Sequence, residues 1–262
     1  MKILALSDLH IHFVFNPRAY SYYKSIVRQK FEGLSEYIDA IVITGDIFES
    51  TAINKWGFNP YETLRDVFCF TDKPIIFCLG NHEFAYNRIG DVLKLFEVCY
   101  NPQLNVHCLD VINKYEIGKY NFIGNVLFYD NTLSNNPFKV DDFIVKNWLD
   151  SKIIEFVPSK ECAIRKKLII DNIQEDKTNI LLTHCVPHEK LNWFSYHEPN
   201  SVYNQYSGCK TFLEELKNVQ WSFSGHTHRR MFTEINGINC VNVGNDYFDE
   251  FDEIKHYIAE ID

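Results

Sequence analysis

The stretch Pro74-Ile75-Ile76-Phe77-Cys78-Leu79-Gly80-Asn81-His82-Glu83 joins an apolar run to a polar tetrad. The run is bounded by proline and glycine, which predicts a strand buried on both faces of a parallel sheet. The tetrad therefore lies at the carboxyl end of that strand, where open α/β sheets bind their ligands. A glycine there lets the backbone turn sharply and approach a bound group. Taken alone, Asn81 and His82 would more often make turn and cap hydrogen bonds, so the interpretation depends on how the other strands end.

The first two predicted strands end in the same way. Residues 2–6 form an apolar run followed by Asp8-Leu9-His10, and residues 39–44 form a β-branched run closed by Gly45-Asp46. In an extended chain Asp8 and His10 would point to the same side, because side chains alternate with a period of two. Between the two runs, apolar residues at helical spacing predict a helix over residues 18–38. Strand, helix and strand form a parallel βαβ unit.

Two further predicted strands have histidines at their ends. Residues 179–183 end at His184, and residues 219–224 end in Gly225-His226-Thr227-His228. A single histidine after a strand is more often structural. Together, however, five strands end in carboxylate, amide or imidazole groups, and burying so many polar groups is costly unless they share an ion. The sequence therefore predicts a metal centre at the carboxyl ends of the strands.

The number and kind of these donors indicate which ions would bind. Mixed oxygen and nitrogen ligands suit Mn, Fe or Zn, whereas Mg and Ca prefer oxygen alone. There are too many donors for one ion and about enough for two, and the two oxygens of Asp46 could bridge both ions. Two divalent ions in such a site would keep a net positive charge, which attracts an anionic phosphate ester. They would also lower the pKa of bound water.

The rest of the chain predicts the elements that surround this site. Helices are expected over residues 61–70, 89–100, 164–173 and 210–217, and short strands over 106–109 and 120–123. A second, more antiparallel sheet is expected from residues 231–235, 238–243 and 257–261. Loops are expected at residues 47–60, 130–132, 135–137 and 185–208, the last long enough to be functional or mobile. The basic run at residues 165–167 is interpreted as a solvated patch.

Length, composition and charge restrict the class of protein. The 262 residues, 46% hydrophobic and 23% charged, fit one globular domain over residues 1–262 and exclude a disordered or fibrous class. The net charge of −9 argues against long duplex DNA as a partner, because non-specific affinity for it comes from clustered Lys and Arg. The eight cysteines contain no C-x-x-C pair and are interpreted as small buried hydrophobes in a reducing cytoplasm. No targeting signal or membrane span is visible, and nothing indicates the oligomeric state.

The motifs at the strand ends follow a recognisable order. They read D-x-H at residues 8–10, G-D at 45–46, G-N-H-[DE] at 80–83, H at 184 and G-H-x-H at 225–228. This pattern, which spans most of the chain, resembles that of the calcineurin-like metallophosphoesterases. The resemblance implies an α/β fold in four layers, a sandwich of two mixed β-sheets flanked by helices, with a dinuclear metal site at the carboxyl ends of the strands.

The resemblance also implies a role for each residue of these motifs. One metal would be held by Asp8, His10, Asp46 and His228, and the other by Asp46, Asn81, His184 and His226. His82 would bind neither metal and would steady the transition state or protonate the leaving oxygen. Manganese is the first choice of metal, with iron or zinc as alternatives.

Two departures from the family's patterns narrow the function. The family's protein phosphatases continue the second motif as G-D-x-x-D-R-G, whereas this chain has Glu49-Ser50 and lacks that arginine, so a protein serine/threonine phosphatase is not expected. The acidic composition and modest length also disfavour the family's DNA repair nucleases, which are larger and carry extra domains.

These observations predict a metal-dependent phosphoesterase that hydrolyses a phosphomonoester or phosphodiester, small-molecule or nucleotide, by attack of a hydroxide that bridges the metals. One alternative is a nuclease on short or single-stranded nucleic acid, with Trp193, Phe194 and Tyr196 as stacking surfaces. Another is a metal-binding scaffold without turnover, which the complete set of ligands disfavours. The same aromatic cluster could form one wall of a nucleobase pocket, with Phe84 and Tyr86 as the other wall. Alternatively, these aromatic residues could simply pack against the domain.

Overall fold

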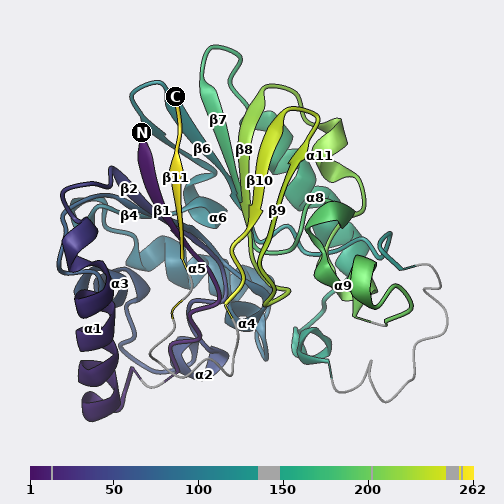
Figure 1. Cartoon of the computed structure of the whole chain (residues 1–262). Coiled ribbons are helices and arrows are strands. Elements are labelled where there is room, and N and C mark those ends of the chain that lie inside the picture. The colour runs from purple at the N-terminus through teal and green to yellow at the C-terminus, as the bar shows by residue number, and fades with distance from the viewer. Residues whose placement is uncertain (13, 135–147, 202, 246–253, 255) are drawn as a thin grey trace.

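Two β-sheets stand face to face between two layers of helices (Figure 1). The structure is a computed structural model that describes residues 1–12, 14–134, 148–201, 203–245, 254 and 256–262. The loop predicted at residues 135–137 lies outside these residues. The prediction of a four-layer α/β fold with two mixed sheets is confirmed.

The first sheet has the order β11-β1-β2-β3-β4. Its strands are β11 (Tyr257–Glu260), β1 (Lys2–Leu6), β2 (Ala40–Thr44), β3 (Ile75–Cys78) and β4 (Val106–Cys108). Neighbouring strands from β1 to β4 pair in parallel, and β11 pairs antiparallel with β1. The expectation that residues 257–261 join the second sheet is therefore wrong. The alternating pattern of residues 257–261 predicts a strand, but its pairing with β1 depends on tertiary structure and cannot be predicted from the local sequence.

The second sheet has the order β5-β6-β7-β8-β10-β9. Its strands are β5 (Lys114–Ile117), β6 (Tyr120–Asn125), β7 (Thr178–Thr183), β8 (Val219–Ser224), β10 (Ile238–Asn242) and β9 (Met231–Ile235). The four central strands are parallel, and only the edge strands β5 and β9 are antiparallel. The predicted antiparallel character thus holds only at the edges. None of the four residues of β5 is buried. The strand therefore lacks the buried apolar run from which the other strands are predicted.

Helices cover the outer face of each sheet and also occur in the connections. The α-helices are α1 (Pro17–Phe31), α2 (Ser50–Ile53), α3 (Pro60–Val67), α4 (Asn81–Phe84), α5 (Ile89–Cys99), α6 (Leu109–Ile112), α8 (Pro158–Asp171), α9 (Trp193–His197), α10 (Asn204–Ser207) and α11 (Phe212–Glu215). The 3-10 helices are η1 (Glu32–Leu34), η2 (Pro102–Leu104), η3 (Leu149–Lys152) and η4 (Glu189–Leu191). Residues 47–60 and 185–208, predicted as loops, therefore contain short helices.

Alternation along the strands builds three apolar layers. On β1, Ile3 and Ala5 face the second sheet and pack with Ile180 of β7, whereas Leu4 and Leu6 face the helix layer of α1, α3 and α5. On the far side, residues of β6 and β7 pack against α8 and α11. Both faces of the parallel strands are thus buried, as the continuous apolar runs predict.

Asn-Pro pairs begin two α-helices and one 3-10 helix. The side-chain oxygens of Asn16, Asn59 and Asn101 each accept a hydrogen bond from a backbone N–H of the following turn, at 3.2, 3.1 and 3.0 Å respectively. Proline follows each cap at the first helical position, where its missing N–H costs nothing and its fixed φ suits the helix.

The basic run at residues 165–167 is a solvated patch only in part, because Lys167 is exposed but Arg165 is buried. Arg165 is only 4% exposed, and its guanidinium lies 3.8 Å from the Asp110 carboxylate. Asp110 in turn accepts hydrogen bonds from the backbone N–H groups of Leu79 and Val126 at 2.7 and 3.1 Å. The first basic residue therefore faces inward and neutralises a carboxylate that ties the end of β3 to the end of β6.

His107 of β4 gives the fold a pH-dependent contribution to stability. Burial, with Arg65 acting in the same direction, lowers the pKa of this 4%-exposed ring to about 4. The unfolded chain, with a histidine pKa of about 6.5, therefore binds the proton first as the pH falls. Stability from the neutral ring is fully present above pH 6.5 and is lost between 6.5 and 4, by at most about 1.4 kcal/mol per pH unit. We expect His107→Gln to flatten the fall in urea midpoint between pH 7 and pH 5.

The exposed His197 provides the matched control for this measurement. A His197→Gln variant should keep the wild-type dependence on pH. Equal pH dependence in His107→Gln and wild type would contradict the assignment of this contribution to His107.

Among the described residues, no helix has both the length and the apolar character needed to cross a lipid bilayer.

Candidate metal centre

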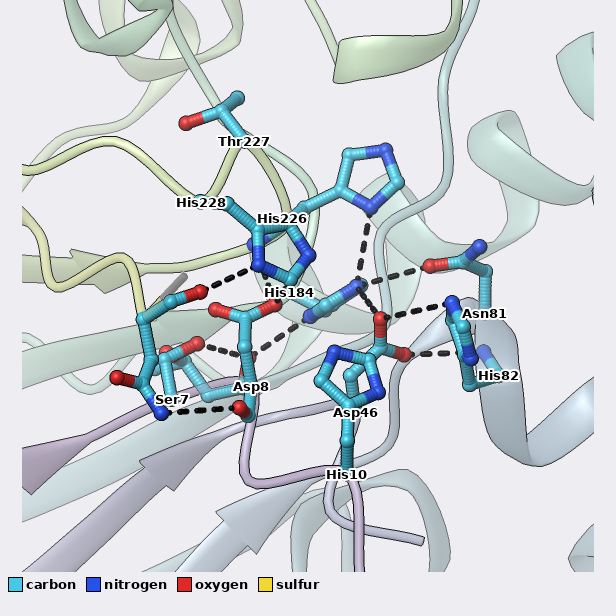
Figure 2. Close-up of polar contacts among 12 residues, drawn as sticks. Ser7, Asp8, His10, Asp46, Asn81, His82, His184, His226, Thr227 and His228 are labelled. Carbon is cyan, nitrogen blue, oxygen red and sulfur yellow. Dashed lines mark hydrogen bonds and ion pairs between the residues drawn. The ribbon is translucent and has the colours of Figure 1, made fainter. Parts of the chain in front are cut away.

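The carboxyl ends of five strands from both sheets meet at one place. Figure 2 shows their side chains pointing toward one another across the gap between the sheets. The first sheet contributes Asp8 and His10 after β1, Asp46 after β2, and Asn81 and His82 after β3. The second contributes His184 after β7, and His226 and His228 after β8. The structure thus brings together the side chains that the sequence singles out.

Four ligand-type atoms converge in one half of the centre. His184 Nε2 lies 2.9 Å from Asn81 Oδ1, 3.2 Å from Asp46 Oδ2 and 3.1 Å from His226 Nδ1. Asp46, Asn81 and His184 are at most 3% exposed. This group has the same members as one of the two predicted ligand sets.

Backbone carbonyls fix the tautomers of three histidines. The pairs are His184 Nδ1 with Thr44 O at 2.9 Å, His226 Nε2 with Tyr206 O at 2.8 Å, and His228 Nδ1 with Asn245 O. A carbonyl only accepts, so each of these nitrogens carries hydrogen, and the other nitrogen of the neutral ring turns a lone pair to the centre. The lone pairs of His184 and His226 then face each other and the oxygens of Asp46 and Asn81. Only positive charge between them reconciles this arrangement.

The ionisation of the buried groups indicates the same demand for positive charge. Burial opposes a charged His184 ring, but the Asp46 carboxylate more than offsets it and raises the pKa of His184 to about 10. Burial, together with the neighbouring His184, lowers the pKa of His226 to about 4. Burial also opposes the charged form of Asp46, yet the surrounding histidines hold its pKa well below the ordinary value. Without a bound cation, the anionic Asp46 would thus keep a proton on His184 Nε2, and a cation in the centre would replace that proton.

The other half of the centre consists of Asp8, His10 and His228. One ligand atom from each lies within 4.8 Å of the others, and Asp8 Oδ1 is 3.8 Å from His228 Nε2. Asp8 Oδ1 accepts a hydrogen bond from the backbone N–H of His226 at 3.1 Å. Asp8 Oδ2 is buried, and no group within the described part of the chain gives it a hydrogen bond. A buried carboxylate oxygen of this kind fits a cation.

The backbone at the centre is strained. Asp8, His10, Asp46, His226 and His228 all have φ between 46° and 69°, the left-handed region that non-glycine residues rarely adopt. Each such residue costs about 1–3 kcal/mol, and such conformations cluster at functional sites. The extended chain expected for Asp8 and His10 is therefore wrong, although the two side chains do reach the same cluster.

Glycines of the motifs make room for the neighbouring strands. A Cβ on Gly80 would lie 2.1 Å from Asp46 Oδ1, and one on Gly225 would lie 1.9 Å from Ser7 Oγ and 2.8 Å from Asp8 Oδ2. Any larger residue would displace a candidate ligand. These two positions therefore need glycine for close approach across the strand ends.

Buried carboxylates outside the predicted set orient the candidate ligands. The Asn81 amide donates through Nδ2 to Asp150 Oδ1 at 2.6 Å, which turns Asn81 Oδ1 inward. Glu83 Oε1 accepts from the N–H groups of Ile47 and Phe48, and Glu83 Oε2 from Gly80 N–H, all at 2.7 Å. Glu83 is visible in the tetrad at the end of β3, whereas no periodic pattern marks Asp150 in η3.

Glu49 joins His10 and His82 at the mouth of the centre. Its Oε1 lies 2.9 Å from His10 Nδ1 and 3.0 Å from His82 Nδ1. Burial would raise the pKa of Glu49, but the two histidines lower it to about 2. Burial likewise opposes a charged His82, yet Asp46 and Glu49 raise its pKa to about 9. Glu49 is not among the residues predicted for the site, although its position three residues after Asp46, in the second motif, is a signal for it.

A cavity of about 350 Å³ opens beside these groups. It is lined by Asp46, Asn81, His82, Trp148, Leu149, His226 and His228. The expected aromatic walls do not line it. Trp193 stacks on His197 with ring centroids 4.3 Å apart, and Phe84 is fully buried against Phe128. Trp148, which the sequence analysis did not single out, provides the aromatic wall instead.

The chain belongs to the calcineurin-like phosphoesterase family. The family's sequence profile matches residues 1–230, which confirms the resemblance drawn from the motifs. No protein with curated annotation is significantly similar in sequence.

Solved structures with low sequence identity share the fold. A phosphopantetheinyl hydrolase from Mycobacterium tuberculosis superposes with a TM-score of 0.66 at 16% identity, covering 94% of this chain and 89% of that one. A dimetal phosphatase from Danio rerio gives 0.54 at 12% identity, covering 98% and 91%. A purple acid phosphatase from yellow lupin (Lupinus luteus) seeds gives 0.51 at 15% identity, covering 93% and 44%.

Proposed function

We propose that this chain is a phosphoesterase that holds two divalent transition metals, manganese first, with iron or zinc as alternatives. The observation that carries the proposal is the set of imidazole lone pairs that backbone carbonyls turn toward the Asp46, Asn81 and Asp8 oxygens. Asp8, His10, Asp46 and His228 would hold one ion, and Asp46, Asn81, His184 and His226 the other. Asp46 faces both groups and would bridge them.

The bound ions would lower the pKa of a water between them so that it attacks phosphorus, and they would clamp the ester oxygens. The chain's own residues would do the rest. His82 lines the cavity while Glu49 holds its Nδ1, so Nε2 would be the atom that gives a proton to the leaving oxygen or stabilises charge there. Trp148 and Leu149 would exclude bulk water from one side.

The size of the cavity supports a small ester. About 350 Å³ accommodates a phosphate with a group of modest size. The likeness to a phosphopantetheinyl hydrolase and to a dimetal phosphatase supports a hydrolase of phosphate esters, and the proposal keeps both the phosphomonoester and the phosphodiester. The nuclease alternative loses its motivating observation, since the expected stacking residues do not line the cavity. A cytoplasmic location stays a prediction.

A panel of esters tests the proposal. The purified protein, saturated with Mn²⁺, is assayed on p-nitrophenyl phosphate, bis-p-nitrophenyl phosphate, nucleoside monophosphates and a short single-stranded oligonucleotide. We expect turnover of at least one small ester, its loss with EDTA, its return with Mn²⁺, and two metals per chain by elemental analysis. Cleavage of the oligonucleotide alone would favour the nuclease. Two metals without turnover of any substrate would favour the scaffold.

A further inference from the structure

Trp148 lines two cavities. It lines the cavity of about 350 Å³ at the candidate metal centre and also a second one of about 210 Å³. The second cavity is lined by Tyr129, Trp148, Asp150, Ser151, Ile153, Phe156, Pro158 and Tyr206. Trp148 is thus common to the cavity at the candidate metal centre and to a second cavity, in which four of the eight lining residues are aromatic.

The indole is held in place by contacts that lead back to the candidate ligands. Its ring stacks on Tyr206 with centroids 5.0 Å apart and planes 23° from parallel, and Tyr203 packs beside it at 5.5 Å. The carbonyl of Tyr206 is the acceptor of His226 Nε2–H at 2.8 Å. On the other side, Asp150 lies two residues along the chain from Trp148 and accepts the Asn81 amide. Trp148 therefore has a defined position relative to Asn81 and His226.

The lining of the second cavity indicates what it would accept. Tyr129, Phe156 and Tyr206 form an aromatic surface, with Tyr129 5.9 Å from Phe156 and 5.4 Å from Tyr206 between ring centroids. Among the described residues that line either cavity there is no lysine or arginine, and the one charged group of the second cavity is the Asp150 carboxylate. A flat, uncharged group would gain stacking and apolar contact there. Among these described lining residues, a second phosphate or a carboxylate would meet no lysine or arginine and would face Asp150.

We propose that Trp148 and the second cavity form a subsite for the group esterified to phosphate, and that this group is flat, aromatic and uncharged. This inference rests on the proposed function, because it places the phosphate of the same substrate at the candidate metal centre. Aryl groups and nucleosides share this chemistry. In this proposal, substrate specificity is determined in part by the segment after β6, which carries none of the family's motifs.

The test uses phosphonates, which bind without being hydrolysed. Binding of 1-naphthylmethylphosphonate, a nucleoside 5′-phosphonate and methylphosphonate to the Mn²⁺-saturated protein is measured by calorimetry. We expect at least one of the aromatic ligands to bind about 10-fold or more tightly than methylphosphonate, since stacking on an aromatic side chain is worth that much. The stronger of the two identifies the aryl or the nucleoside source.

Two variants locate the effect. Trp148→Leu keeps an apolar side chain but removes the flat surface, and Trp148→Phe restores a smaller one. We expect the leucine variant to lose most of the aromatic preference and the phenylalanine variant to keep part of it. The preference is the ratio of aromatic to methylphosphonate affinity within one variant, so a loss of binding common to both ligands cancels. Trp193→Leu makes the same change outside both cavities and should leave all binding unchanged.

The outcomes separate this inference from the proposed function. Equal binding of aromatic and methyl phosphonates to wild type, or an aromatic preference that survives Trp148→Leu, would overturn the subsite while leaving the phosphoesterase proposal standing. Failure of all the phosphonates to bind, together with no turnover of small esters, would overturn both. Tighter binding of a ligand with a second phosphate would contradict the uncharged class.

Discussion

Asp46→Asn is expected to lower phosphoesterase turnover by at least about 10³-fold and to reduce the metal content below two per chain. Asp46 faces both halves of the centre, His10 on one side and His184 with His226 on the other. An asparagine offers one oxygen and no charge, so it cannot bridge two cations. Metal stabilisation of a phosphoryl transition state is worth several kcal/mol, and each 1.36 kcal/mol is tenfold in rate. Elemental analysis and kcat on the preferred small ester measure the two effects.

The variant should remain folded, because the substitution leaves an oxygen where Asp46 Oδ1 accepts the N–H of His82 at 2.9 Å. Asp66→Asn is the matched control. Asp66 also accepts a hydrogen bond, from Tyr20 Oη at 2.9 Å, but it is exposed and does not line the cavity at the candidate metal centre. A fully metallated Asp46→Asn protein with near-wild-type turnover would show that Asp46 does not bridge the ions.

The sequence predicted the candidate site well because its signals are local. Four of the five strands that carry candidate ligands contain a short apolar run, and the fifth, β8, alternates apolar with polar residues. Each candidate ligand stands within a few residues of the end of its strand. The periodicity of the run fixes the strand, and parallel strands bring their carboxyl ends to one edge. In the structure β7 and β8 pair with each other and end together, which brings His184 and His226 side by side.

Other features could not be predicted from the sequence because they depend on packing between segments that are distant in the chain. β11 is recognisable as a strand, but its pairing with β1 brings together residues at the two ends of the chain. Trp148 follows β6 in a connection without periodicity, and it reaches the centre only because Tyr206 and Asp150 are folded around it. The basic run that begins at Arg165 predicts an exposed patch, because the sequence does not show that Arg165 faces the carboxylate of Asp110.

His82→Asn is expected to keep both metals and to lower kcat by about 10²–10⁴-fold, the usual contribution of general acid–base catalysis. The ring lines the cavity, and its Nδ1 is held by Glu49 at 3.0 Å, which leaves Nε2 for the leaving oxygen. An asparagine keeps the backbone N–H that binds Asp46 but cannot carry the proton. Rates with p-nitrophenyl and alkyl esters, together with the metal content, are the measurements.

The leaving group decides which role His82 plays. A p-nitrophenolate leaves without a proton, so loss of a proton donor should affect the p-nitrophenyl ester much less than the alkyl ester. Glu49→Gln supplies a second variant, which removes the charge that orients His82 but leaves the imidazole in place. It should show a smaller loss, with the same difference between the two esters. An equal loss for both esters would exclude the proton-donor role and leave electrostatic stabilisation of the transition state, because a fixed positive charge acts on the phosphoryl oxygens whichever group departs.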